Sequence, residues 1–501
     1  MRNVQYEKLI GLRLVLLILA GTTSASAQVA QWPQFRGTGG SGLGGAASAP
    51  VDLKSPETIL WKTDLPPGHS SPSIWGNRIF VTAADKATKN LEVLCLDRMT
   101  GAILWRRSVT ADNIERLHEI GSPAQASPAV DGERVYASFG SYGLIAFDFE
   151  GQQKWTVPLP AANHAFGSAG SPIVVGDAVI LSRDDNPEGY LLAVDRRTGA
   201  TLWKQAYTVP NGRGAAGTAT PVLWNDEIIV HRSPEVVAFD RKDGTKKWWV
   251  RTQSTSTGTP VVGRDAVYVG TWFPVGEPDL RVPLPDFSAL LKSDKNADGA
   301  LSADELPETI QLAQRIEVAV KGANIAFPGK AMIGALDLNK DGKVGKEEWE
   351  GFVASFASDH GLLAIKPGGQ GDVTLTHVLW RESRGVPEVP TPLVSSNRVF
   401  MVTNGGIVTC MDATTGKVLF RTRLGAGGAY YASPVMAGEH LYFTSGDGVV
   451  TVIRDADQFT PAGRSELAEP VFATPAIVDG HIYVRTATRL YAFRRAPPPL
   501  P

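Results

Sequence analysis

One repeat of the sequence reads SPIVVGDAVILSRDDNPEGYLLAVDRRTGATLW, from Ser171 to Trp203. Runs of apolar and β-branched residues alternate with Gly, Asp and Asn turns, which is typical of four short antiparallel strands. Seven other segments open in the same way, with a hydroxyl residue before proline: Ser71, Ser127, Thr220, Thr259, Thr391, Ser433 and Thr474. Eight units of four strands at this period predict an all-β, eight-bladed propeller.

A recurring phrase, AVDRRTGATLW at residues 193–203, joins the third and fourth strands of the repeat. It returns around Trp105 and Trp248 and, in a weaker form, around Phe420. The phrase resembles the tryptophan-docking motif of quinoprotein-like propellers. Because Asp and Gly make the turn and Trp packs on a neighbouring blade, we expect these residues to be structural.

The resemblance covers residues 57–273 and 360–495. The last repeat ends after its third strand, Leu490 to Phe493, so its fourth strand must come from elsewhere. The stretch from Thr58 to Leu65 has no blade of its own and should complete the final blade. Such closure pairs the edge strands that would otherwise promote aggregation.

The chain contains two cysteines, Cys95 and Cys410. Both occupy the third-strand position that Ala193 fills in its repeat, so we expect them to be packing residues. They fall in the first and sixth repeats, which are not neighbours in a ring of eight. We therefore expect no disulfide between them.

The first 27 residues have the pattern of an export signal. Basic residues precede an apolar run from Leu9 to Ala20, and a small-residue cleavage site ends at Ala27. We expect a mature chain in the periplasm or outside the cell, with no transmembrane segment after signal removal; an uncleaved anchor is the alternative. Residues 28–56 hold a lead-in, WPQFRG at 32–37, similar to that of the quinoprotein-like propellers. A Gly, Ala and Ser-rich run from Gly37 to Pro50 is predicted to be a flexible or loosely packed linker.

The spacing from Thr259 to Thr391 exceeds that of the other repeats by about 85 to 90 residues. The excess predicts a separate small all-α domain, residues 274–359, which replaces one loop between strands. The propeller is expected to resume over residues 360–495, before a Pro-rich tail at 496–501.

Two loops in this insertion, residues 294–305 and 337–348, carry the EF-hand pattern of oxygen ligands around a glycine at the sixth position. Apolar residues before the first loop and after the second predict helices that pack together as an EF-hand pair. Two calcium ions are therefore predicted, with a structural role favoured over a sensory one. The predicted ligands are Asp294, Asn296, Asp298, Ala300, Ser302, Glu305, Asp337, Asn339, Asp341, Lys343 and Glu348, with Ala300 and Lys343 acting through their carbonyls.

Ligands of propellers usually lie in a funnel formed by the loops before the first strand and between the second and third strands. The insertion replaces a loop on this face. We assign no catalytic or cofactor-binding residue there. The polar residues that the repeat places at the funnel are His69, His118, Gln125, His164, Arg183, Asp184, Arg213, His231, Arg232, Asn404, Tyr430 and Arg485.

Two functions remain open. The favoured one is an exported calcium-binding module for an unidentified protein, peptide or small molecule, comparable to the propeller lipoprotein that helps assemble outer-membrane proteins. The alternative, implied by the quinoprotein resemblance, is an oxidoreductase of alcohols or sugars that uses the quinone PQQ, although the adjacent cysteine pair of those enzymes is absent. Nucleic acid is not expected as a partner, because 49 basic residues nearly balance 51 acidic ones.

Overall fold

The computed structural model describes residues 29–163, 166–185, 188–208, 217–232, 234–252, 254, 257–273, 276–278, 281–314, 324–355 and 360–496. The predicted signal at residues 1–27 lies outside the described residues, as do His164 and Arg213. Within the described part of the chain, no helix is both long enough and apolar enough to span a membrane.

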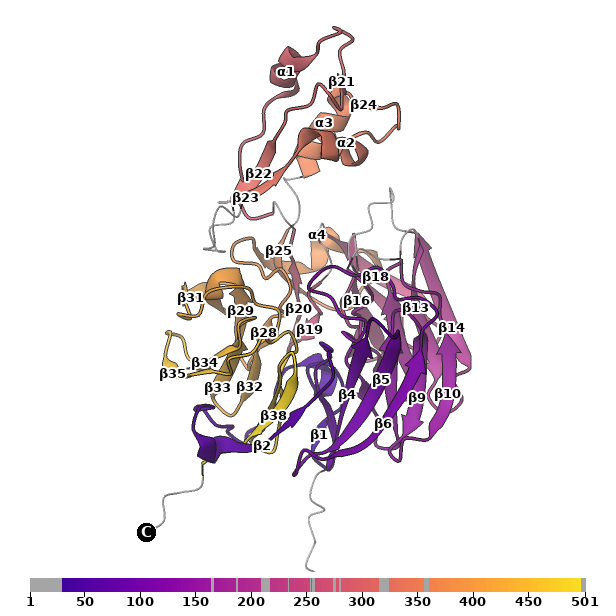
Figure 1. Ribbon diagram of the computed structural model, residues 1–501. Coiled ribbons are helices and arrows are strands. Elements are labelled where there is room, and N and C mark those ends of the chain that lie inside the picture. The colour runs from indigo at the N-terminus through magenta and orange to yellow at the C-terminus, as the bar shows by residue number, and fades with distance from the viewer. Residues whose placement is uncertain are drawn as a thin grey trace, which may run out of the picture.

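Eight antiparallel sheets surround a central axis, so the predicted eight-bladed propeller is confirmed (Figure 1). The first four blades are β3 (Ser73–Trp75), β4 (Arg78–Asp85), β5 (Asn90–Asp97) and β6 (Ile103–Thr110); β7 (Ala129–Val130), β8 (Arg134–Phe139), β9 (Gly143–Asp148) and β10 (Gln153–Pro158); β11 (Ile173–Val175), β12 (Ala178–Arg183), β13 (Glu188–Asp195) and β14 (Thr201–Thr208); and β15 (Val222–Trp224), β16 (Glu227–Arg232), β17 (Glu235–Asp240) and β18 (Lys246–Arg251).

The remaining blades follow the same order. They are β19 (Val261–Val262), β20 (Val267–Thr271), β25 (Gly361–Ile365) and β27 (Val378–Glu382); β28 (Leu393–Val394), β29 (Arg398–Thr403), β30 (Ile407–Asp412) and β31 (Val418–Arg423); β32 (Val435–Ala437), β33 (His440–Thr444), β34 (Val449–Arg454) and β35 (Pro461–Glu466); and β36 (Ala476–Val478), β37 (His481–Arg485), β38 (Arg489–Phe493) and β2 (Ile59–Asp64).

The ring closes as predicted, because β2 pairs antiparallel with β38 in the last blade. Two short strands extend other blades: β1 (Gln31–Trp32) pairs with β3, and β26 (Gly371–Asp372) pairs with β18. Short helical turns lie outside the strands, at η1 (Thr38–Gly40), η2 (Pro56–Thr58), α4 (Thr374–His377) and η6 (Asn404–Gly406). Both cysteines are free and buried, which confirms that they are packing residues.

Hydroxyl groups link the blades around the axis. In seven of the eight blades, the residue before the proline that opens the repeat donates its backbone N–H to the hydroxyl oxygen of its counterpart in the next blade, over 2.9 to 3.1 Å. Among the described residues, seven such bonds connect, in order, Ser71, Ser127, Ser171, Thr220, Thr259, Thr391, Ser433 and Thr474. All eight residues are buried, so these bonds satisfy groups that water does not reach. We call these residues the hydroxyl ring.

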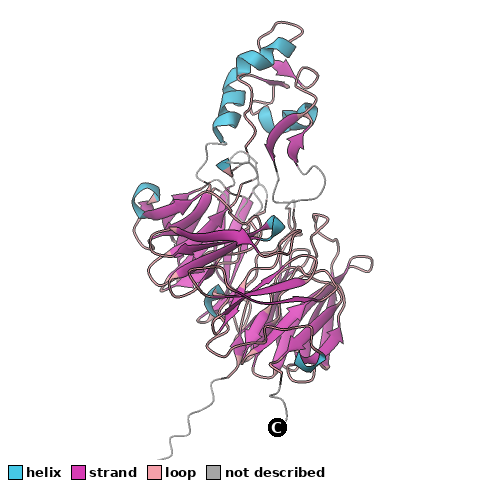
Figure 2. Cartoon of the chain, turned by 90° about the vertical axis from the view of Figure 1, so that its left-hand side faces the viewer, coloured by secondary structure: helices cyan, strands magenta, loops and turns pink. Residues whose placement is uncertain are grey.

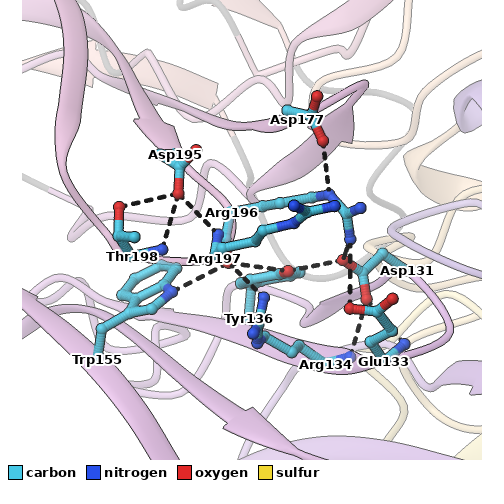
Figure 3. A network of polar contacts seen from close by, with 10 residues as sticks. All are labelled: Asp131, Glu133, Arg134, Tyr136, Trp155, Asp177, Asp195, Arg196, Arg197 and Thr198. Atoms are coloured by element: carbon cyan, nitrogen blue, oxygen red, sulfur yellow. Dashed lines mark hydrogen bonds and ion pairs between the residues drawn. The ribbon is translucent and has the colours of Figure 1, made fainter.

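The docking phrase links the blades at their periphery (Figure 3). The indole N–H of Trp155 in the second blade donates to the carbonyl oxygen of Arg196 in the third, at 3.0 Å, while Asp195 accepts the N–H of Thr198 at 2.8 Å and holds the turn. Gly199 has a φ of 74°, and a Cβ there would lie 2.9 Å from the indole of Trp155. The predicted structural role of the phrase is therefore confirmed.

The Gly, Ala and Ser-rich run expected to be a flexible linker is instead held against the propeller. Gly44 donates to the carbonyl of Met436, and Met436 donates to the carbonyl of Gly42. Ala49 and Leu53 are buried in the core between the first, seventh and eighth blades. Small side chains allow this close backbone approach, so composition alone misled the prediction.

The insertion begins after β20 and ends before β25, which pair with each other, so it occupies a loop between the second and third strands. It stands clear of the propeller body (Figure 2). Its elements are α1 (Phe287–Leu290), η5 (Leu291–Ser293), β21 (Leu301–Ser302), β22 (Ile310–Gln314), β23 (Asn324–Phe327), α2 (Gly329–Leu336), β24 (Lys343–Val344) and α3 (Lys346–Ser355).

The prediction that this domain is all-α is wrong. A hairpin of β22 and β23 follows the first loop, so the domain contains strands as well as helices. Pro307 lies just after that loop, and a proline in the interior of a helix removes a donor and clashes with the preceding turn. The helices before the first loop and after the second are present, and their apolar residues Phe287, Leu290 and Trp349 share one core.

We expect Thr220→Val to destabilise the protein by about 1 to 3 kcal/mol, because it leaves the buried N–H of Ser171 without its acceptor. The measurement is the free energy of unfolding in urea. Thr201→Val makes the same change at an exposed position of β14 and should alter stability by less than about 0.5 kcal/mol. Equal losses in both variants would contradict the role given to the hydroxyl ring.

Candidate functional site

A cavity of about 290 Å³ lies on the axis, at the face that carries the insertion. All eight residues of the hydroxyl ring line it. So do the residues two positions before each of them, because side chains of an extended chain point to the same side at every second residue. This second set, which we call the variable ring, consists of His69, Gln125, Ala169, Thr218, Thr257, Val389, Tyr431 and Phe472.

The N-terminal lead-in reaches the other end of the central channel. The Arg36 guanidinium is fully buried and donates to the carbonyl oxygens of Pro392 and Pro434, both at 2.9 Å, in the sixth and seventh blades. Phe35, its neighbour in the sequence, lines the cavity. The lead-in therefore contributes the floor, and the cavity is a funnel that opens toward the insertion.

Aromatic side chains form much of the wall. Phe472 stacks between His69 and Tyr431, with ring centroids 4.1 and 5.2 Å apart. Across the funnel, His118 stacks on Phe166 at 5.2 Å. Flat apolar faces of this kind bind aromatic, aliphatic or cationic groups.

The funnel carries little positive charge. Burial, followed by the charges of Arg485 and Lys86, lowers the pKa of His69 to about 4, so this ring is neutral at pH 7. Glu388 is the acidic residue among the described lining residues, and no Lys or Arg is among them. The site can therefore bind and orient a ligand, but no nucleophile paired with a base is found in the described wall.

Three of the polar residues predicted for the funnel, His69, His118 and Gln125, line it. Others do not line it and hydrogen bond to the protein instead: the buried Arg183, His231, Arg232, Tyr430 and Arg485, and the partly buried Asn404. Asp184 is also buried and outside the lining. Burial raises the pKa of Asp184 to about 7, although the charge of Arg232 opposes this.

The prediction missed several lining residues, including Phe35, Trp272, Glu388, Tyr431 and Phe472. The search was limited to polar residues, so it left out the apolar rings of Phe35 and Phe472. The position two residues before each Ser-Pro or Thr-Pro would have identified both Tyr431 and Phe472.

The two predicted calcium loops share one backbone conformation. The fourth and sixth residues have positive φ in both, 58° and 82° at Ala297 and Gly299, and 63° and 85° at Lys340 and Gly342. Their eighth residues, Leu301 and Val344, pair between β21 and β24. Two sequences with the same pattern thus adopt the same turn.

The side-chain hydrogen bonds of the loops also correspond. The first Asp of each loop accepts the N–H of its glycine, Asp294 from Gly299 at 2.9 Å and Asp337 from Gly342 at 2.8 Å. The last Glu of each loop accepts the N–H of the ninth residue; for Glu305 and Glu348 both distances are 2.9 Å. The ligand atoms that the loops can offer a metal ion are carboxylate, amide and carbonyl oxygens, the ligands that calcium takes.

In the described residues, however, no three His, Cys, Asp or Glu side chains are arranged to hold a metal ion. The carboxylates accept hydrogen bonds from N–H groups of their own loops. The ammonium of Lys343, in the second loop, lies 2.5 Å from the carboxylate of Asp298 in the first loop. Calcium binding at these residues therefore stays a prediction.

The funnel does not fit PQQ, a planar quinone that carries carboxylate groups. An anion of this kind favours cationic partners, whereas the described lining residues include the carboxylate of Glu388 and no Lys or Arg. Cys95 and Cys410 are buried in separate blades and could not cover a quinone together.

Comparisons with known proteins agree with the fold. The family model for the outer membrane protein assembly factor BamB matches residues 51–282 and 329–460. BamB of Bordetella pertussis is 27% identical over 249 residues, which are 45% of this chain and 59% of that protein, so the match spans less than two thirds of the relative.

Solved structures with lower identity share the fold alone. The crystal structure of BamB from Moraxella catarrhalis has a TM-score of 0.53 at 15% identity and covers 87% of this chain and 98% of its own. Quinohemoprotein alcohol dehydrogenase from Comamonas testosteroni has a TM-score of 0.56 at 13% identity and covers 93% and 81%.

We expect His231→Gln to weaken the dependence of stability on pH. Burial lowers the pKa of His231 from 6.5 to about 4, although its bond to the Gly258 carbonyl opposes this shift. As pH falls below 6.5, His231 takes up a proton in the unfolded chain but stays neutral in the folded chain until about pH 4. The wild type therefore loses stability over this range.

Urea unfolding at pH 6.5 and 5 measures the effect. The wild type should lose roughly 2 kcal/mol more than the variant over this interval. His69 and His360 remain in both proteins and cancel in the comparison. Parallel pH profiles would contradict the assignment of His231 as a buried neutral group.

Proposed function

This chain belongs to the family of the outer membrane protein assembly factor BamB, and from that premise we propose that it is an exported, calcium-binding propeller that binds a protein partner. The partner contacts the face that carries the funnel and the inserted domain. The periplasm is the proposed location, in agreement with the predicted signal and with the role named for the family.

One observation supports this proposal above the others: the fold presents an open funnel whose described wall is built for binding and contains no catalytic set. A rigid ring of eight blades positions the variable ring and the loops around it. Such loops on a rigid scaffold are where propellers recognise partners. The inserted domain enlarges the same face (Figure 2).

The oxidoreductase alternative has less support. Its structural relatives share 13% identity with this chain, which is evidence for the fold alone. The funnel lining, with Glu388 and neutral rings, is the opposite of what an anionic quinone requires.

Calcium has a proposed structural role in the inserted domain. The cation would be held by the carboxylate, amide and carbonyl oxygens of the two loops, and it would join the loops that β21 and β24 already pair. Lys343 and Asp298 connect the loops with an ion pair, so the cation would have to compete with the ammonium for this carboxylate.

We expect the mature chain to bind the purified outer membrane protein assembly machinery of its own organism through the funnel face. Phe166→Glu places a charge at an exposed ring of the funnel wall and should weaken binding at least tenfold in biolayer interferometry. Met99→Glu changes a similarly exposed residue in a turn of the opposite face and should leave affinity unchanged. Absence of wild-type binding, or equal effects of both variants, would refute the proposal.

We expect calorimetric titration to find two calcium ions per chain. Glu305→Gln and Glu348→Gln should each reduce the stoichiometry to one, because each removes the charged ligand that closes a loop. Glu350→Gln, a nearby exposed position of α3 outside the loop, should leave two. A wild-type stoichiometry of zero would show that the loops are acidic turns only.

A further inference from the structure

A carboxylate is held in a fixed position at the funnel wall. The Asn404 amide donates to Glu388 Oε2 at 2.8 Å, and Asn404 in turn accepts the N–H of Tyr430 at 2.8 Å. The Thr257 hydroxyl donates to the backbone carbonyl of Glu388. Glu388 is thus tied to two neighbouring segments of the wall, so its charge has a defined place.

Aromatic faces stand beside this carboxylate. Burial raises the pKa of Tyr431, and the negative charges of Glu388, Asp447 and Glu119 raise it further. Phe472 and His69 continue the stack from Tyr431. Trp272 and Phe35 add further apolar surface to the same cavity.

Two positive charges also lie near the funnel, where they act on His69. The Lys86 ammonium donates to the carbonyl of Gly121 at 3.3 Å on the rim. Arg485 is buried and donates to the carbonyls of Ser70 and Thr82, at 3.1 and 2.7 Å. The positive charges therefore act on the His69 side of the described wall, and the negative charges act on the Tyr431 side.

We propose that the funnel takes a positively charged side chain, lysine or arginine, from a segment of the protein partner. This inference rests on the proposed function and names the chemistry that the funnel recognises. The cationic head lies at Glu388 and over the face of Tyr431, while the aliphatic stem lies along Phe472 and Trp272. A cation is attracted both by a carboxylate and by the negative face of an aromatic ring.

The size of the cavity agrees with one side chain. A volume of about 290 Å³ holds a long side chain and part of its backbone, but not a folded element. The hydroxyl ring at the base offers oxygens that can accept hydrogen bonds from an ammonium or a guanidinium.

Pentapeptides test the inference: acetyl-Ala-Ala-X-Ala-Ala-amide, with arginine, lysine, norleucine or glutamate at X. Binding is measured by calorimetry and by quenching of tryptophan fluorescence. The arginine and lysine peptides should bind at least tenfold more tightly than the norleucine peptide, and the glutamate peptide most weakly. Salt should weaken the first two.

Two variants locate the site. Glu388→Gln should reduce the preference for arginine over norleucine at least tenfold, and Tyr431→Leu should weaken all peptides. Glu439→Gln, an exposed carboxylate in a turn of the opposite face, should change nothing. Unaltered urea midpoints show that each variant is folded.

Equal affinity for arginine and norleucine peptides, or full arginine preference in Glu388→Gln, would overturn the inference while leaving binding of the assembly machinery intact. Binding of free N-acetylarginine amide as tight as that of the pentapeptide would overturn the polypeptide as the source of the cation. Failure of the proposed function would instead appear as loss of binding to the whole machinery.

Discussion

The bond from a backbone N–H to the hydroxyl of the next blade is the constraint on which the rest of the structure depends. It fixes the first strands of neighbouring blades at one height around the axis, in a place that water does not reach. Because the register is fixed, the residue two positions earlier in every blade reaches the same cavity. The recognition surface is therefore a consequence of how the scaffold is held together. Sequence can vary in the variable ring while the hydroxyl ring stays the same.

The funnel and the inserted domain are joined by consecutive residues of the chain. Trp272 lines the funnel, and the next residue, Phe273, packs against the core of the inserted domain. His360, directly before β25, accepts the N–H of Phe273 at 3.2 Å. Glu277 accepts the N–H of Gly385, which follows β27 of the fifth blade, at 2.9 Å. The two strands that carry the insertion are thus tied together at its base. The funnel residue Trp272 and the residue that packs in the inserted domain, Phe273, are thus consecutive residues directly after β20.

Much of the fold follows from the sequence because its signals are local and repeated. The Ser-Pro or Thr-Pro start, the Asp-Gly turn and the docking Trp identify blades, and the unpaired stretch around Trp61 identifies the closure. Signals that depend on tertiary contact were missed. The run after Gly37 has the composition of a linker, yet its small residues allow it to lie against the blades. Pro307, directly after the first loop, was a sequence signal against an all-α domain that the prediction did not use. Polarity was the wrong criterion for predicting which residues line the funnel. Arg485 and Tyr430 donate hydrogen bonds to backbone carbonyls, whereas Tyr431 and Phe472 line the cavity.

Hydrogen–deuterium exchange, measured by mass spectrometry with and without the purified assembly machinery, tests the central claim most directly. The account predicts protection of the peptides that contain Gln125, Glu388 and Tyr431 on the funnel face, with no change in the docking turns around Arg98 and Arg196 on the opposite face. Protection confined to those docking turns would contradict it.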